Sequence, residues 1–332
     1  MFLLIFIAIF VFLAGACSTD PGYTSIRGYA QGGTYTVTLS LDNHLKQKDL
    51  SLLIEQCFHD IDFSVSGYNK ASSLSRFNAG ESIGKDSLLT ELFEISRRLW
   101  ESTEGAFDPS AGPLFDFWGF GFEEGGIRQP DDPRTIAAVD SLKDFTGMSH
   151  FSIGEEGGLV RDDPRCRLNF NAIALGYTCY VIGRRLTEKG VRNFLIEVGG
   201  EILCKGVNPG GDKWRIGIDT PKDGSMKAGE SISAIISVND CGVVTSGNYR
   251  KFYKDSTGRK IAHTIDPSTG FPAENNLLSA TVIAPTSAEA DALATWAMVA
   301  GYEKARNRIE ADTLLRAYLI TTDGVWSNIE GL

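Results

Sequence analysis

Hydrophobic and polar residues recur along the chain at spacings that predict a mixture of strands and helices. Over residues 28–41, Val and Leu alternate with Thr and Ser, which predicts a half-buried strand opened by a glycine pair. Apolar residues at helical spacing predict helices over about 46–64, 86–101, 133–143, 171–190, 287–299 and 302–311. Short apolar runs predict strands over about 193–206, 214–219, 231–238, 241–247 and 277–285, and a closing hairpin over 315–331. The expected fold class is α+β, with helices packed outside mixed strands.

Residues 105–122 break this pattern. They read GAFDPSAGPLFDFWGFGF, which is rich in aromatic residues, Gly and Pro and has no clean period. Because so apolar a segment cannot be a solvated loop, we expect it to pack irregularly. Irregular packing of this kind is commonest at functional sites.

The overall charge narrows the classes of partner. The 332 residues carry a net charge of -10, and 42% of them are hydrophobic. That is ample for a globular core. A nucleic-acid binder needs a basic surface that releases counterions, so we expect no nucleic-acid partner.

The N-terminus is apolar over residues 1–16 and ends in small residues before Cys17. It is short for a membrane span, and it looks like a bacterial lipoprotein signal that is cleaved before Cys17, whose thiol is then acylated. Residues 17–25 would be a tether, and the fold would occupy residues 26–332. The alternative is an uncleaved anchor helix.

The cysteines are Cys17, Cys57, Cys166, Cys179, Cys204 and Cys241. Without Cys17 their number is odd, and no CxxC or metal-type spacing occurs. We therefore expect buried free thiols that behave as small apolar side chains.

Two oxygen-bearing residues share one face of the expected helix over 287–299. Thr286 and Glu289 fit a capping box, which fixes where this helix begins. Asp291 and Thr295 are then four residues apart, so their oxygens project from the same face. Such hard ligands suit Mg²⁺. The alternative is a solvated or locally bonded pair.

The segment HTIDPSTGFP, residues 263–272, combines one of four histidines with a rigid turn. Pro267 and Pro272 restrict the backbone, and Gly270 permits a left-handed turn. If residues 261–265 form a strand, Asp266 could come round the turn to meet a ligand or the imidazole of His263. A neutral imidazole is the natural general base near pH 7. The alternative is an Asp-capped turn beside a surface histidine.

Other segments offer weaker signals. Phe107 is a possible stacking surface, and Asp108 is held by the proline that follows it. EVGGE (197–201) and TSGNY (245–249) present small residues at expected strand ends, where backbone N–H groups can approach phosphate. A tight turn would explain each Gly pair equally well.

Taken together and in order, these segments resemble the ApbE family of flavin transferases. The segments that carry the resemblance are GGTYTV (32–37), SGYNKASSLSRFN (66–78), TEGAFDPSAGPLFDFWGFG (103–121), EVGGE, TSGNYRKFY (245–253), HTIDPSTGFP and ADALAT (290–295). The resemblance covers nearly the whole chain after the signal.

The resemblance implies a T-fold-like α+β core of mixed or antiparallel sheet. It implies Mg²⁺-dependent cleavage of FAD at its pyrophosphate, with transfer of FMN to a Thr or Ser hydroxyl of a partner flavoprotein. Partners of such enzymes are subunits of membrane redox complexes, and members are commonly exported and tethered. The expected location is the periplasmic side of a bacterial inner membrane. Some members instead hydrolyse FAD to FMN and AMP, and a flavin-binding lipoprotein without chemistry is the remaining alternative.

Residue by residue, the resemblance implies a set of roles. Asp291 and Thr295 match metal-binding side chains, and Ala172 matches a position that offers a backbone carbonyl. Flavin-nucleotide contacts are implied for Gly32, Tyr68, Ala106, Phe107, Asp108, Asn169, Leu175 and Ile265. His263 matches the proposed base for the acceptor hydroxyl, with Asp266 beside it as a second catalytic candidate. This chain departs from the family at Asn169, Leu175 and Ala294, where members often carry charged residues, so we expect fewer side-chain oxygens around the metal.

Overall fold

An antiparallel sheet of eight strands forms the centre of the fold in the computed structural model, which describes residues 22–41, 45–122, 127–222, 229, 231–249 and 252–332. The strands follow the order β1-β2-β5-β6-β9-β12-β13-β14, and every neighbouring pair is antiparallel. Their bounds are β1 Tyr23–Ala30, β2 Gly33–Ser40, β5 Phe194–Val198, β6 Glu201–Lys205, β9 Cys241–Gly247, β12 Leu277–Ala284, β13 Arg316–Thr321 and β14 Val325–Ser327.

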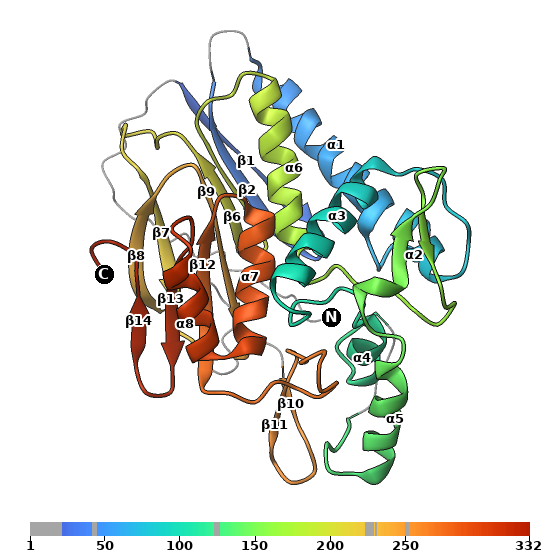
Figure 1. Ribbon diagram of the computed structural model, residues 1–332. Helices are drawn as coiled ribbons and strands as arrows, with labels where there is room; N and C mark the ends of the chain where they lie inside the picture. Colours follow the sequence, from blue (N-terminus) through green and yellow to red (C-terminus); the bar gives the residue numbers. More distant parts are fainter. Residues whose placement is uncertain (1–21, 42–44, 123–126, 223–228, 230, 250–251) are drawn as a thin grey trace, which may run out of the picture.

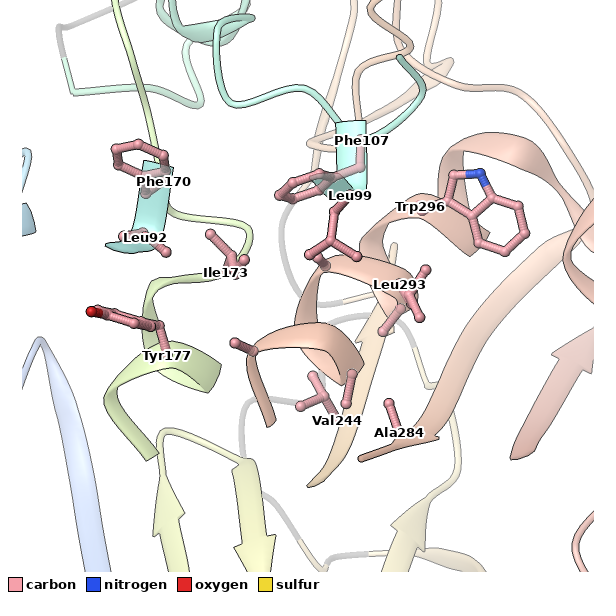
Figure 2. Close-up of a cluster of buried hydrophobic side chains, with 14 of the residues drawn as sticks. Leu92, Leu99, Phe107, Phe170, Ile173, Tyr177, Val244, Ala284, Leu293 and Trp296 are labelled. Atoms are coloured by element: carbon pink, nitrogen blue, oxygen red, sulfur yellow. The ribbon is translucent and has the colours of Figure 1, made fainter. Parts of the chain in front are cut away.

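Helices cover one face of this sheet (Figure 1). The longer ones are α1 Gln47–Val65, α3 Ser87–Ser102, α6 Ala174–Glu188, α7 Ser287–Ala300 and α8 Tyr302–Ala311. Val244 of β9 and Val282 of β12 point into a core that also holds Phe107, Leu293 and Trp296. Figure 2 shows Phe107 and Leu99 above α7, with Val244 and Ala284 on its sheet side. The α+β prediction is confirmed.

The opposite face is covered by a pair of strands outside the main sheet. β7 Trp214–Asp219 and β8 Ile232–Val238 pair with each other, and their apolar residues pack on β6, β9, β12 and β13. Val243 lies in this cluster whereas its neighbour Val244 lies in the helix-side core, because successive strand residues point to opposite faces. Both faces of the central strands are therefore buried.

A third group of elements lies at one end of the sheet (Figure 1). It comprises the helices α4 Gly112–Phe117 and α5 Pro133–Lys143 and the strands β10 Phe252–Lys254 and β11 Lys260–Ala262. Trp118, Val139, Ile261 and Ile265 form its small core. The remaining short elements are α2 Ser73–Asn78, the 3-10 turn Met148–His150 and the strands β3 Phe151–Ile153 and β4 Leu159–Arg161.

Two glycines let neighbouring elements approach the first turn of α7. A Cβ on Gly176 of α6 would lie 2.3 Å from the carbonyl oxygen of Ser287, and one on Gly242 of β9 would lie 2.4 Å from the Ser287 Cα. The predicted capping box is present, because Thr286 and Glu289 bond reciprocally. The start of α7 is thus fixed both by its cap and by close packing.

Most of the elements expected from the sequence are present, and the differences are confined to short or edge elements. β1 begins at Tyr23, inside the segment expected to be a tether, and pairs with β2 through a turn at Gln31–Gly32. The short helices α2 and α4 and the β10–β11 pair were not expected. The strand expected over 261–265 ends at Ala262.

The described cysteines are buried and free, as expected. Residues 1–16 and Cys17, on which the lipoprotein prediction depends, lie outside the described residues. Within the described part of the chain, the helices lack the length and apolar character needed to cross a membrane.

Candidate active site

A cleft of about 280 Å³ lies where the helix-covered sheet meets the end group of α4, α5, β10 and β11. Its walls come from segments far apart in sequence. Most of the residues singled out from the sequence line it: Ala106, Phe107, Asp108, Asn169, Ala172, Leu175, His263, Ile265, Asp291 and Thr295. Folding therefore brings these separate segments to one place.

The α7 wall carries the expected metal ligands. Asp291 is only 5% exposed, and one carboxylate oxygen accepts a hydrogen bond from the backbone N–H of Gly176 at 2.9 Å. Burial raises the pKa of Asp291 to about 7, although this hydrogen bond partly opposes the rise. The hydroxyl of Thr295, one turn further on, lies 3.4 Å from that of Ser246 on β9. Ala172 lines the same cleft just before α6.

This donor set fits a divalent cation. Among the described residues, no Lys or Arg forms an ion pair with Asp291, so its carboxylate is buried with only a neutral partner. A buried carboxylate without a positive partner is costly unless a cation joins it. Carboxylate, hydroxyl and carbonyl oxygens are the ligands that Mg²⁺ prefers.

A second cluster of possible ligands lies near this cleft but does not line it. The ligand atoms of His150, Asp162 and Cys166 are within 4.8 Å of one another. The His150 ring nitrogen and the Asp162 carboxylate already contact each other at 2.9 Å. A thiol suits softer metals than Mg²⁺, so the α7 residues are the better magnesium ligands.

Asp108 is held tightly at the opposite wall. One carboxylate oxygen accepts hydrogen bonds from the backbone N–H and the hydroxyl of Ser110, and the other accepts one from the Trp100 indole at 3.1 Å. Burial raises the pKa of Asp108 to about 6 despite these donors. Its orientation is therefore fixed before any ligand binds.

Phe107 occupies a different environment from the one expected. It lines the cleft, but it is only 2% exposed and its ring packs in the helix-side core (Figure 2). It is therefore a wall of the site with no open stacking face. Phe115 and Phe120, from the aromatic segment over 105–122, also line the cleft.

His263 lines the cleft just after β11, with its ring edge to face against Phe120 at 6.2 Å between centroids. The turn that follows is rigid. Gly270 has φ +79, and its carbonyl accepts a hydrogen bond from the Trp118 indole at 2.8 Å. The proline- and glycine-rich turn thus anchors the histidine-bearing segment to the α4–α5 group.

The described contacts of Asp266 lie within its own turn and not with the imidazole of His263. Its carboxylate accepts hydrogen bonds from the backbone N–H and the hydroxyl of Ser268, at 2.9 and 2.6 Å, and it is not part of the cleft wall. Aspartate commonly caps its own turn in this way. Asp266 therefore shapes the turn, and its catalytic role stays a prediction.

Gly32 and Tyr68 lie outside the cleft wall. Gly32 has φ +79 in the β1–β2 turn, and the adjacent Gly33 packs beside Gly199. Tyr68 is 67% exposed, and its hydroxyl accepts a hydrogen bond at 3.1 Å from the side chain of Asn171, which lines the cleft. Tyr68 therefore lies beside the cleft with a largely exposed ring, against which Phe122 packs with 4.9 Å between ring centroids.

Several residues that line the cleft were not expected there from the sequence: Asn171, Glu201, Thr245, Ser246, Thr264 and Val299. Glu201, Thr245 and Ser246 do belong to the EVGGE and TSGNY segments, whose expected position at strand ends near the site is correct. The polar side chains of these two segments were the feature of the sequence that could have identified them as site residues.

Comparison with known proteins agrees with this geometry. The family model described as the ApbE family matches residues 32–319. A relative from Escherichia coli strain K12, named FAD:protein FMN transferase, is 32% identical over 307 residues, covering 91% of this chain and 85% of the relative. The protein of the same name from Vibrio cholerae is 32% identical over 324 residues, covering 96% of this chain and 94% of the relative.

Solved structures give the same result. The flavin transferase ApbE from Vibrio cholerae has a TM-score of 0.79 at 31% identity, covering 93% of this chain and 97% of that chain. The apo form of the flavinyl transferase ApbE from Pseudomonas stutzeri has a TM-score of 0.80 at 31% identity, covering 92% and 94%. The resemblance inferred from the sequence is therefore confirmed: this protein belongs to the ApbE family, and it is a transferase.

Proposed function

We propose that this protein is a Mg²⁺-dependent FAD:protein FMN transferase, which cleaves the pyrophosphate of FAD and attaches FMN through a phosphoester to a Thr or Ser of a partner flavoprotein. The names of its relatives support the substrate and the class of acceptor. The observation that carries the magnesium dependence is the buried carboxylate of Asp291, which faces the cleft beside Thr295.

Asp291, Thr295 and the backbone carbonyl of Ala172 would hold the cation. Bound there, Mg²⁺ would neutralise charge on the phosphate oxygens as the pyrophosphate opens. The low polarity around Asp291, reflected in its raised pKa, strengthens any electrostatic contact made in the cleft. Rigid supports on both walls, Gly176 for Asp291 and Ser110 for Asp108, keep the geometry fixed during the reaction.

His263, which lines the cleft, would take the proton of the acceptor hydroxyl on an imidazole nitrogen. The hydroxyl oxygen then attacks the FMN phosphorus, and AMP leaves. If water takes the place of the acceptor, the same site would release FMN and AMP as a pyrophosphatase. Tyr68 at the rim, with its ring exposed, is placed where it could cover bound flavin and keep water out.

The proposed acceptors are flavoprotein subunits of membrane redox complexes. A lipid anchor on Cys17, at the periplasmic side of a bacterial inner membrane, would bring the enzyme to them. A Cys17→Ser protein should appear in the soluble fraction after cell lysis. Continued tight membrane association would favour an uncleaved anchor helix.

The test combines protein, FAD and Mg²⁺ with and without a candidate acceptor flavoprotein. AMP release and acceptor fluorescence after a denaturing gel together identify a transferase, AMP alone identifies a pyrophosphatase, and intact FAD identifies a binding protein. Asp291→Ala should abolish AMP release. The matched control is Glu303→Gln on the exposed face of α8, which should leave it unchanged.

A further inference from the structure

Two cysteines that the proposed reaction does not use lie side by side on adjacent strands of the central sheet. Cys204 is near the end of β6 and Cys241 begins β9, and the register of this antiparallel pair places them directly opposite. Both belong to the apolar cluster between the sheet and the β7–β8 pair, so both side chains point to the same face. Their sulfur atoms are 4.0 Å apart.

We propose that Cys204 and Cys241 form a disulfide when the chain meets a disulfide oxidant. The bond would join β6 to β9 at the two ends of the chain segment that carries β7 and β8. Directly opposite residues in an antiparallel pair have Cα atoms about 4.5–5.5 Å apart. A disulfide accepts Cα separations of about 4.4–6.8 Å. Side-chain rotation can therefore bring the sulfurs together without moving the strands.

The two thiols also affect each other's ionisation. Contact with the Cys204 thiol lowers the pKa of the Cys241 thiol, and the Arg316 charge adds to this. The same contact, with burial, raises the pKa of the Cys204 thiol. Thiolates are the nucleophiles in thiol–disulfide exchange, and the product is the same whether the exchange begins at Cys241 or at Cys204.

The Cys241 thiolate attacks one sulfur of the oxidant disulfide and releases the other half as a thiol. Cys204, on losing its proton, then attacks the Cys241 sulfur of the mixed disulfide and releases the second half. Overall two protein thiols lose two electrons and two protons, and one oxidant disulfide becomes two thiols.

The bond would be formed while the β7–β8 pair is still folding. Cys204 is 1% and Cys241 4% exposed in the finished fold, so an oxidant has little access afterwards. Around the pair, the Trp214 indole donates to the Lys205 carbonyl and the Gly206 N–H donates to Asp240. A covalent link would reinforce these contacts, which lie where the β7–β8 pair joins the central sheet.

The experiment refolds the reduced full-length chain in a mixture of reduced and oxidised glutathione. Free thiols are then blocked, and the protein is digested with trypsin without reduction. The expected product joins the peptides NFLIEVGGEILCK (193–205) and AGESISAIISVNDCGVVTSGNYR (228–250). Recovery of both peptides with blocked thiols, or of Cys204 joined to another cysteine, would overturn the proposal.

Thermal unfolding gives a second readout. The oxidised wild type should melt about 5–10 °C above the reduced protein, because the link restricts the unfolded chain. Cys241→Ala and Cys204→Ala should each abolish this difference, whereas Cys57→Ala, a buried thiol in another cluster, should keep it. An unchanged or lower melting temperature on oxidation of the wild type would also contradict the proposal.

The Cys204–Cys241 pair lies on the face of the sheet opposite the helices, away from the cleft. AMP release should therefore be the same for the oxidised and reduced proteins. The peptide link can be detected whether or not the protein cleaves FAD. Failure of the disulfide proposal and failure of the proposed function are therefore separate results.

Discussion

Replacing Asp291 by Asn should stabilise the metal-free protein while removing its response to Mg²⁺. The pKa of Asp291 is raised from 3.8 to about 7 by burial. A carboxyl whose pKa is raised on folding favours the folded state only while protonated, so its ionisation destabilises that state as pH rises from about 4 through 7. The difference between the two pKa values, at about 1.36 kcal/mol per pKa unit, lowers the free energy of unfolding by about 4 kcal/mol at pH 8.

Asn is the appropriate substitution because its amide oxygen can still accept the hydrogen bond from Gly176. In EDTA at pH 8, we expect Asp291→Asn to unfold at a higher urea concentration than the wild type. Its free energy of unfolding should be greater by up to about 4 kcal/mol. Mg²⁺ with ADP, which carries a pyrophosphate like that of FAD, should stabilise the wild type by about 2.7 kcal/mol at 100 times its Kd. The variant should lack this gain.

The test is urea unfolding in EDTA and in Mg²⁺ with ADP. It compares the wild type, Asp291→Asn and the surface control Glu303→Gln. The reasoning would be refuted if Asp291→Asn unfolded more easily than the wild type in EDTA. It would also be refuted if the variant gained as much stability from Mg²⁺ as the wild type.

Three further changes probe other parts of the site. Asp108→Asn should remove a pH dependence of the free energy of unfolding, because the pKa of Asp108 is raised to about 6. Between pH 4 and pH 8, urea unfolding should show that the wild type loses about 2 kcal/mol of this free energy relative to the variant. Gly176→Ala should destabilise by about 1–3 kcal/mol in the same assay, because its Cβ meets the Ser287 backbone. Gly84→Ala, where a Cβ has open space, is its control. His263→Ala should lower kcat for FMN transfer about 100-fold and leave FAD binding intact, and an unchanged kcat would exclude it as the base.

Long periodic elements could be predicted from the sequence, because burial of one face fixes their pattern. The helices over 133–143 and 302–311 and the strands over 214–219 and 241–247 have the expected bounds. Most of β1 was missed because it lies at the sheet edge and buries only Ile26, so its alternation is weak. The single strand expected over 28–41 is divided by the turn at Gln31–Gly32. The six-residue helices α2 and α4 are too short to show a helical period.

The site, too, holds residues whose position could be predicted from the sequence and residues whose position could not. The spacing of Asp291 and Thr295 along a capped helix determined that both would face one side, and both line the cleft. Asp266 could not be placed by spacing, because its own turn competes for the carboxylate. Phe107 could not be placed either, since an aromatic residue in a segment without period can face the core or the cleft equally well.

The reciprocal cap at Thr286 and Glu289 has a consequence for how the chain can vary. Every later side chain of α7 is oriented by its count from that cap, at about 100° per residue. One residue inserted between the cap and Asp291 would swing the carboxylate about a quarter turn around the helix axis. An insertion there would therefore turn the proposed metal ligand away from the cleft, although it would change the composition of the helix by only one residue.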